Sequence, residues 1–187
     1  MAGLDSIDSG NIKIGGIDIT SLNDRDLTRL RREHVGFIFQ HFNLVSTLTA
    51  EQNIMLPIKL AKRQVDQELF NNVVERLGIK SRLSHKPHEM SGGQQQRVAI
   101  ARALVAQPTV IFADEPTGNL DSVSSSEVLR FLRDSVDVFG QTVIMVTHDP
   151  IAATYADETI LLADGRITAT LVSPTVEQVV AALQEVE

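Results

Sequence analysis

The sequence predicts an α/β fold with a mainly parallel sheet and an inserted helical subdomain. Three short apolar runs rich in β-branched residues have the composition of buried strands; they lie at residues 35–39, 109–113 and 142–146. Helical patterns separate these runs, and strands that alternate with helices favour a parallel sheet. Residues 49–90 are helical in pattern without a strand, which indicates the inserted subdomain.

Length and composition limit the class of protein. A chain of 187 residues can bury the core of one domain. A net charge of −7 argues against a general nucleic-acid binder. The absence of cysteine excludes disulfides, thiol nucleophiles and cysteine-ligated zinc. No apolar run approaches a membrane span and the first residues lack a signal-peptide pattern, so we expect a cytoplasmic protein.

The first elements are a hairpin, a helix and a strand. Residues 11–20 alternate apolar and polar around Gly15-Gly16, which predicts a β-hairpin. Residues 24–34 then predict a short polar helix that leads into the strand at 35–39.

The inserted segment has its own helix signals. Thr49 and Gln52 form a capping-box pattern before a helix that we expect to bend or end near Pro57. Four apolar residues at helical spacing predict the buried stripe of a second helix: Phe70, Val73, Val74 and Leu77. Another helix is predicted to begin at Ser91.

The C-terminal part contains two further helices and a hairpin. One helix is expected to bury Val128, Leu132, Val136 and Phe139 along one face. An Asp164-Gly165 turn predicts the hairpin. Ser173 and Pro174 have the types of an N-cap and a first helical residue, before a helix with four residues expected to face inward: Val176, Val179, Val180 and Leu183.

Polar residues follow each of the three sheet strands. Gln40 follows the first, Asp114 and Glu115 the second, and His148 the third. An Asp-Glu pair after one strand is most often a solvated turn. Because the carboxyl ends of parallel strands meet at one edge of a sheet, an amide, two acids and an imidazole there favour a shared site.

The run "HEMSGGQQQRVAIARAL" carries a second candidate site. Ser91 has the type of an N-cap and Gln94 lies three residues later, while Gly92 and Gly93 leave backbone N–H groups open at the helix start. A helix N-terminus of this kind suits an anion such as phosphate. The alternative is an ordinary capped helix.

The same run resembles the signature motif of ABC-type ATPases, with Met90 in place of leucine. The resemblance extends to about Ala169 and implies a P-loop NTPase-like ABC ATPase fold. It implies a RecA-like core at 1–48 and 91–172, the helical subdomain at 49–90 and a C-terminal helix at 173–187. "ADEPTGNLD" and "LRREHVGFIFQ" resemble most the lipoprotein-releasing and macrolide-exporter branch.

The resemblance also implies roles for the residues at the strand ends, with ATP and Mg²⁺ as cofactors. Gln40 would be the Q-loop glutamine that ligates magnesium. Asp114 would bind magnesium through water, and Glu115 would be the general base. His148 would be the switch histidine on the γ-phosphate. Phosphoryl transfer needs such a metal, an oriented water and donors around the phosphate.

Further residues would act across a dimer. The signature residues would contact the γ-phosphate held by the opposite subunit: Ser91, Gly92, Gly93 and Gln94. Asp121 in the D-loop would lie at the dimer interface. The implied partners are a second ATPase subunit and a membrane permease of the FtsX type, at the inner face of the cell membrane, with no nucleic acid.

One family element is missing from these residues. The phosphate-binding Walker A run, Gly-x-x-x-x-Gly-Lys-Ser/Thr, does not occur. The start "AGLDSIDSGNIKIGG" resembles the segment that follows this loop and its helix, so we expect the chain to be truncated before or within the Walker A helix. We therefore expect it to be inactive in ATP hydrolysis alone.

Three interpretations stay open at this point. The chain is a truncated transporter ATPase, or a non-catalytic module that lends its signature and D-loop to an intact subunit. The third is an ABC protein of DNA repair or chromosome maintenance. In that class, long coiled coils or zinc modules separate the Q-loop from the signature motif. Here the two motifs are at Gln40 and Ser91, and neither heptads nor cysteines occur.

Overall fold

The computed structural model describes residues 4–5 and 7–185. Part of the start that resembles the segment after Walker A, residues 1–3 and 6, lies outside the described residues. The chain forms two compact units, residues 1–145 and 146–187, which are described separately. In the described part of the chain, no helix combines the length and the apolar character needed to cross a membrane.

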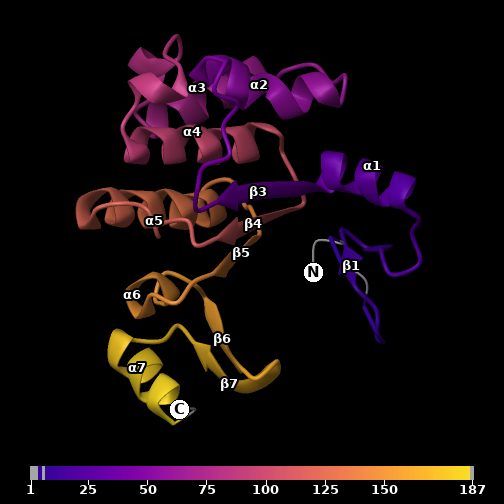
Figure 1. The fold of residues 1–187 in the computed structure, drawn as a ribbon, viewed down its shortest axis with the longest axis vertical. Helices are drawn as coiled ribbons and strands as arrows, with labels where there is room; N and C mark the ends of the chain where they lie inside the picture. The colour runs from indigo at the N-terminus through magenta and orange to yellow at the C-terminus, as the bar shows by residue number, and fades with distance from the viewer. Residues whose placement is uncertain (1–3, 6, 186–187) are drawn as a thin grey trace. The chain divides into compact units, whose positions relative to one another are not determined.

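The first unit contains most of the predicted elements (Figure 1). In chain order they are β1 (Lys13–Ile14), β2 (Ile17–Asp18), α1 (Asp24–His34), β3 (Val35–Phe39), α2 (Ala50–Leu60), α3 (Gln67–Arg76), α4 (Gly92–Val105), β4 (Val110–Asp114), α5 (Ser122–Asp137) and β5 (Val143–Val146), whose last residue belongs to the second unit. Two short 3₁₀ turns, Lys80–Arg82 and Pro87–Glu89, join α3 to α4.

The three apolar runs form one sheet, as the sequence predicts, and the strand order in it is β3-β4-β5. Strands β3 and β4 are parallel, with Val35 opposite Val110 and Phe39 opposite Asp114. Strand β4 begins one residue later than predicted and includes Asp114. The α/β class with a parallel sheet is confirmed.

One face of this sheet packs against the helices. Ile38, Ile111 and Ala113 are buried there together with apolar residues of α2, α3, α4 and α5. Figure 1 shows α2, α3 and α4 gathered on one side of β3. Gly36 permits this close packing, because a Cβ there would lie 3.1 Å from both Ile111 Cγ1 and Pro108 Cγ.

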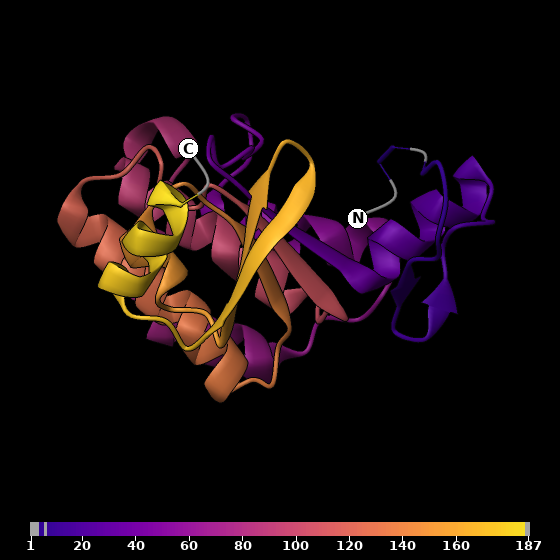
Figure 2. The same cartoon turned by 90° about the horizontal axis from the view of Figure 1, so that it is seen from below.

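The opposite face carries aromatic residues. Phe37 stacks on Phe39 and on Phe112, with ring centroids 5.5 and 6.1 Å apart. Phe37 and Phe112 also pack against a smaller core that includes Ile14 from the hairpin and Leu30 from α1. Figure 2 shows the indigo hairpin and α1 side by side.

The local signals in the first unit are confirmed. Gly15 and Gly16 have φ of 57° and 81°, which the two-residue turn between β1 and β2 requires. Thr49 forms the predicted capping box with Gln52. Helix α2 continues for three residues beyond Pro57 and ends at Leu60, as expected from the proline.

The predicted apolar stripes are largely confirmed. Phe70, Val73, Val74 and Leu77 are all buried. Ser91 is the N-cap of α4. In α5, Val128 and Leu132 are buried, whereas Phe139 lies beyond the end of the helix.

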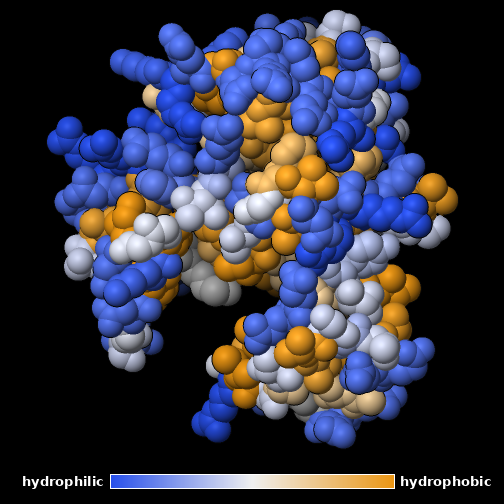
Figure 3. Space-filling model, turned by 180° about the vertical axis from the view of Figure 1, so that it is seen from behind, coloured by the Kyte–Doolittle hydropathy of each residue, from blue (hydrophilic) through white to orange (hydrophobic). Residues whose placement is uncertain are grey.

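The second unit contains α6 (Pro150–Ala153), β6 (Glu158–Ala163), β7 (Arg166–Val172) and α7 (Val176–Gln184). The predicted hairpin turn is confirmed, with Asp164 and Gly165 at φ of 49° and 73°. Four large apolar residues of the hairpin are exposed: Ile160, Leu162, Ile167 and Val172. Figure 3 shows such apolar side chains, in orange, at the molecular surface.

The predicted start of the last helix is wrong. Its N-cap is Thr175, which forms a capping box with Gln178. Ser173 has φ of 44°, whereas an N-cap residue needs extended backbone. Of the four residues expected to face inward, only Val179 is buried, and Val176, Val180 and Leu183 are 36–43% exposed.

Candidate functional site

The ends of β3 and β4 coincide at one edge of the sheet. Phe39 is opposite Asp114, so Gln40 and Glu115 are the next residues along the two strands. Asp114 is exposed, and Gln40 and Glu115 are half-buried. Three of the predicted site residues therefore lie at this edge, which we call the strand-end site.

A tight turn positions Glu115. Its φ of 43° lies in the left-handed region, which is uncommon for residues other than glycine and is concentrated at functional sites. The carbonyl oxygen of Glu115 accepts a hydrogen bond from the N–H of Gly118 at 3.1 Å. The turn therefore directs the Glu115 side chain away from the strand's regular alternation.

Helix α4 is hydrogen-bonded to this turn. Gln96 is fully buried, and its Nε2 donates to the carbonyl oxygen of Pro116 at 2.7 Å. Pro116 follows Glu115 directly, so α4 and the turn that contains Glu115 are joined by a buried hydrogen bond. The sequence analysis missed Gln96; the signal was an amide one helical turn before Ile100, on a face of α4 that is buried in the core.

The side chain of Gln40 pairs with the D-loop. Its Nε2 donates to Asn119 Oδ1 at 3.3 Å, and Asn119 Nδ2 donates to the carbonyl oxygen of Gln40 at 3.0 Å. Gly118 lies against the same side chain, since a Cβ there would be 2.7 Å from Gln40 Nε2. Asn119 was also missed by the sequence analysis, because no local pattern marks it.

An arginine fastens the loop after Gln40. Arg102 donates from Nη1 to the carbonyl oxygen of Asn43 at 2.6 Å and from Nη2 to that of Phe42 at 3.0 Å. Both of these loop residues have positive φ, 61° at Phe42 and 47° at Asn43. Burial lowers the pKa of the Arg102 guanidinium from its ordinary value. The loop, with two residues at positive φ, is thus held by a half-buried cation on α4.

The signature residues form a capped helix start. Ser91 Oγ accepts from the N–H of Gln94 at 3.3 Å, and Gln94 Oε1 accepts from the N–H of Ser91 at 3.0 Å. The N–H groups of Gly92 and Gly93 stand in the first turn, where an α-helix offers no acceptor of its own. Ser91 itself is exposed. The geometry suits an anion and equally an ordinary cap.

Asp121 caps the neighbouring helix α5. It accepts from the N–H groups of Val123 and Ser124 at 3.1 and 3.0 Å and from Ser124 Oγ at 2.7 Å. The Ser124 N–H and hydroxyl are the main causes that lower the pKa of the Asp121 carboxyl below its ordinary value. A Cβ at Gly93 would lie 2.8 Å from Ser124 Oγ, so the starts of α4 and α5 pack closely.

His148 belongs to the second unit. It is exposed and lies between Thr147 and Asp149, and Asp149 caps α6 by accepting from the N–H of Ile151 at 2.8 Å. The N–H of Asp149 in turn donates to Thr147 Oγ1 at 3.1 Å. The role of His148 on a phosphate stays a prediction.

The donor atoms of the strand-end site fit magnesium in part. Asp114, Glu115 and Gln40 offer carboxylate and amide oxygens, the ligands that Mg²⁺ takes in proteins. Within the part of the chain that the structure describes, no group of three or more histidine and acidic side chains could hold a metal ion. A magnesium ion here would therefore take most of its ligands from water, and from phosphate oxygens when a nucleotide is bound.

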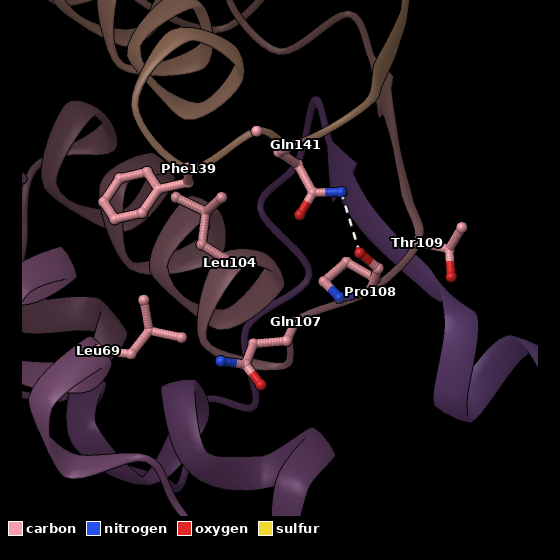
Figure 4. A pocket seen from close by; sticks show the side chains of 8 residues that line it. Leu69, Leu104, Gln107, Pro108, Thr109, Phe139 and Gln141 are labelled. Carbon is pink, nitrogen blue, oxygen red and sulfur yellow. Dashed lines mark hydrogen bonds between the residues drawn. The ribbon is translucent and has the colours of Figure 1, made fainter. Parts of the chain in front are cut away.

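A separate cavity of about 350 Å³ lies where the N-terminal side of β4 meets α3 and the end of α5 (Figure 4). Leu104 and Phe139 line it, and Gln141 Nε2 donates to the carbonyl oxygen of Pro108 at 3.0 Å beside it. None of its lining residues is a predicted site residue. It therefore adds nothing to the strand-end site.

Comparison with known proteins identifies the family. Residues 1–118 match the family model described as ABC transporter. The chain is 44% identical over 169 residues to the bacitracin export ATP-binding protein BceA of Halalkalibacterium halodurans. The aligned residues are 89% of this chain and 67% of that protein. The chain is 42% identical to the lipoprotein-releasing system ATP-binding protein LolD of Bacteroides fragilis, over 89% of this chain and 78% of that protein.

A longer relative and a solved structure agree with this result. The macrolide export ATP-binding/permease protein MacB of Rhodopseudomonas palustris is 47% identical over 96% of this chain, which spans only 28% of that protein. The fold matches the ATP-binding cassette MJ0796, solved as a dimer in a post-hydrolysis state bound to ADP and Pi, with a TM-score of 0.78 and 37% identity over 93% of this chain and 78% of that one. The chain belongs to the ABC transporter family, and it has the fold of that family's ATP-binding cassette.

Proposed function

We propose that this chain acts as the ATP-binding and ATP-hydrolysing subunit of an ABC transporter of the export or lipoprotein-release type. The observation that carries the proposal is the register of β3 and β4, which puts Gln40, Asp114 and Glu115 at one edge of the sheet. The relatives named for bacitracin export, lipoprotein release and macrolide export support the transporter type.

In the proposed reaction, water attacks the γ-phosphorus of ATP and the bond to the bridging oxygen breaks, which yields ADP and phosphate. Glu115 takes the proton from the attacking water, and the left-handed turn at Glu115 sets the direction of its carboxylate. Asp114 and Gln40 would hold Mg²⁺, which would neutralise charge on the phosphates. His148 donates a hydrogen bond to the γ-phosphate.

The proposed active form contains two ATPase subunits. Ser91 and the N–H groups of Gly92 and Gly93 bind the γ-phosphate of the ATP on the opposite subunit, where the helix dipole favours negative charge. Asp121 lies at the interface between the subunits. A permease of the FtsX type carries the substrate, and the subunits sit at the cytoplasmic face of its membrane. The dimer of the cassette MJ0796 supports this arrangement.

The phosphate-binding loop must come from outside these 187 residues, since they contain no Walker A run. We therefore propose that this polypeptide alone does not turn over ATP. A second candidate function is a non-catalytic module that lends its signature and D-loop to an intact subunit. The capping box at Ser91 and the N-cap at Asp121, both formed in full, support this candidate.

A chimaera tests the proposed function. The segment of LolD from Bacteroides fragilis that carries its Walker A run is joined ahead of this chain, and Mg²⁺-dependent ATP hydrolysis is measured. Glu115→Gln is expected to abolish turnover and retain ATP binding, because Glu115 acts on the water and not on the phosphates. Glu75→Gln, an exposed change on α3, is the matched control. Unchanged kcat in Glu115→Gln contradicts the assignment of the base.

A further inference from the structure

Gln40 and Asn119 form a reciprocal pair across 79 residues of sequence. One bond runs from the Gln40 side chain to Asn119 Oδ1, and the other from Asn119 Nδ2 back to the Gln40 carbonyl oxygen. A single side chain at 119 thus restrains both the backbone end of β3 and the amide of Gln40. With Nε2 engaged by Asn119, the atom that Gln40 has left for a metal is Oε1.

Gly118 completes this restraint. A Cβ at position 118 would lie 2.7 Å from Gln40 Nε2, 3.1 Å from its Cδ and 3.3 Å from its Cγ. The Gln40 side chain therefore packs closely against Gly118, and its torsions are limited by this contact as well as by hydrogen bonds. A residue larger than glycine at 118 would displace Gln40.

Asn119 also borders the signature helix. A Cβ at Gly92 would lie 3.8 Å from the carbonyl oxygen of Asn119, 3.5 Å from Leu120 Cδ2 and 3.6 Å from Phe42 Cζ. The start of α4, the D-loop and the loop after β3 thus meet around Gly92. Asn119 contacts the strand-end site through its side chain and faces the signature through its backbone.

We propose that Asn119 is the positioning residue for Gln40, which holds the Gln40 amide so that Oε1 faces the metal beside Asp114. This inference deepens the proposed function and rests on it. Asparagine suits the position because it carries a donor and an acceptor on one short side chain. Alanine offers neither group, and aspartate offers the acceptor without the donor.

The metal alone, as Mn²⁺, is a suitable probe of the 187-residue chain, since Mn²⁺ takes the same oxygen ligands as Mg²⁺ and broadens nearby NMR signals. The measured quantity is the broadening of the Gln40 side-chain NH₂ divided by that of the Asp114 backbone N–H. Gln40→Glu, which deletes that NH₂ signal, assigns it. The ratio corrects for any change in overall metal affinity.

In the native chain both signals should broaden together. In Asn119→Ala the ratio should fall by about threefold, because dipolar broadening depends on the inverse sixth power of distance and a displacement of about 1 Å suffices. Asn119→Asp keeps the acceptor for Gln40 Nε2 and should restore the ratio. Asn72→Ala removes an exposed asparagine that accepts from Arg76, and it should leave the ratio unchanged.

The outcomes separate this inference from the proposed function. An unchanged ratio in Asn119→Ala, or broadening of Asp114 without Gln40 in the native chain, overturns the role of Asn119 and leaves the metal site standing. No broadening of either signal overturns the metal site and the positioning role with it. If Asn119→Ala does not fold, Asn119→Ser, whose hydroxyl is too short to make both bonds, is judged by the same ratio.

Discussion

The fully buried Gln96 on the signature helix donates to the carbonyl oxygen of Pro116, 2.7 Å away, in the turn that follows Asp114 and Glu115. This bond joins the helix that would bind one nucleotide to the turn that would hydrolyse another. Among the described residues, Gln96 Oε1 has no hydrogen-bond partner. The buried, unpaired oxygen lowers the stability of the fold and offsets part of the gain from the bond to Pro116.

Gln96→Leu should lower the free energy of unfolding by about 1–2 kcal/mol, because the Pro116 carbonyl loses its donor in a buried place. The relief of the unpartnered Oε1 limits the loss. Urea unfolding measures the change. Gln67→Leu is the control, since Gln67 is exposed and its side chain donates to Asn71 Oδ1 at 3.3 Å on the surface of α3. Equal stability of the native chain and Gln96→Leu would contradict a structural role for the bond.

The two glycines of the signature should respond differently to alanine. At Gly92 a Cβ meets its neighbours at 3.5 Å or more, so Gly92→Ala should keep or raise stability through its better helix propensity, worth up to about 1 kcal/mol. At Gly93 a Cβ lies 2.8 Å from Ser124 Oγ and 3.1 Å from Ser124 Cβ. Gly93→Ala should therefore be the less stable variant in thermal unfolding.

A double variant checks the cause of that difference. Ser124→Ala removes the hydroxyl that the new methyl group would meet, so it should cost less in the Gly93→Ala background than in the native chain. Additive effects of the two changes would show that contact with Ser124 is not the source of the strain.

Asp121 should make the chain sensitive to acid. Its folded pKa lies below the ordinary 3.8, because the Ser124 N–H and hydroxyl stabilise the carboxylate. Its contribution to stability is therefore complete above pH 3.8 and is lost as the pH falls through the folded pKa. Asp121→Asn keeps a good N-cap without a charge. The stability gap between the two chains should be larger at about pH 5 than at about pH 3 in urea unfolding; a gap independent of pH would contradict this.

Ser91→Arg should abolish ATP-dependent association with an intact relative such as LolD, because the arginine would fill the position proposed for the γ-phosphate of that subunit. The fold should survive, since losing a helix cap costs only about 1 kcal/mol. Ser91→Ala removes the same cap without the bulk and separates the two effects. Association is followed by size-exclusion chromatography with and without ATP.

The nucleotide content of such a mixed dimer gives a second test. These 187 residues contain no Walker A run, which supplies several charge-assisted hydrogen bonds of at least about 1.5 kcal/mol each. Four of these amount to about 6 kcal/mol, or on the order of ten-thousand-fold in affinity. One bound nucleotide per dimer is therefore expected, and two would contradict the half-site interpretation.

The sequence by itself determined the parts of this protein that depend on near neighbours in the chain. Turns at Gly15-Gly16 and Asp164-Gly165, the capping box at Thr49 and the cap at Ser91 all involve residues within four positions of one another, and all are confirmed. The strand ends were also readable, because an apolar run that stops at a polar residue marks the edge of a buried sheet.

Only the tertiary structure decided which side chains support the strand-end site. Asn119, Gln96 and Arg102 have no local signature, since their contacts with Gln40, Pro116 and the loop at Phe42-Asn43 cross 20 to 79 residues. The error at Ser173 has the same origin. Its N–H donates to the carbonyl oxygen of Asp157 at 2.8 Å, a contact outside the reach of local propensity, and its backbone there is left-handed and cannot cap a helix.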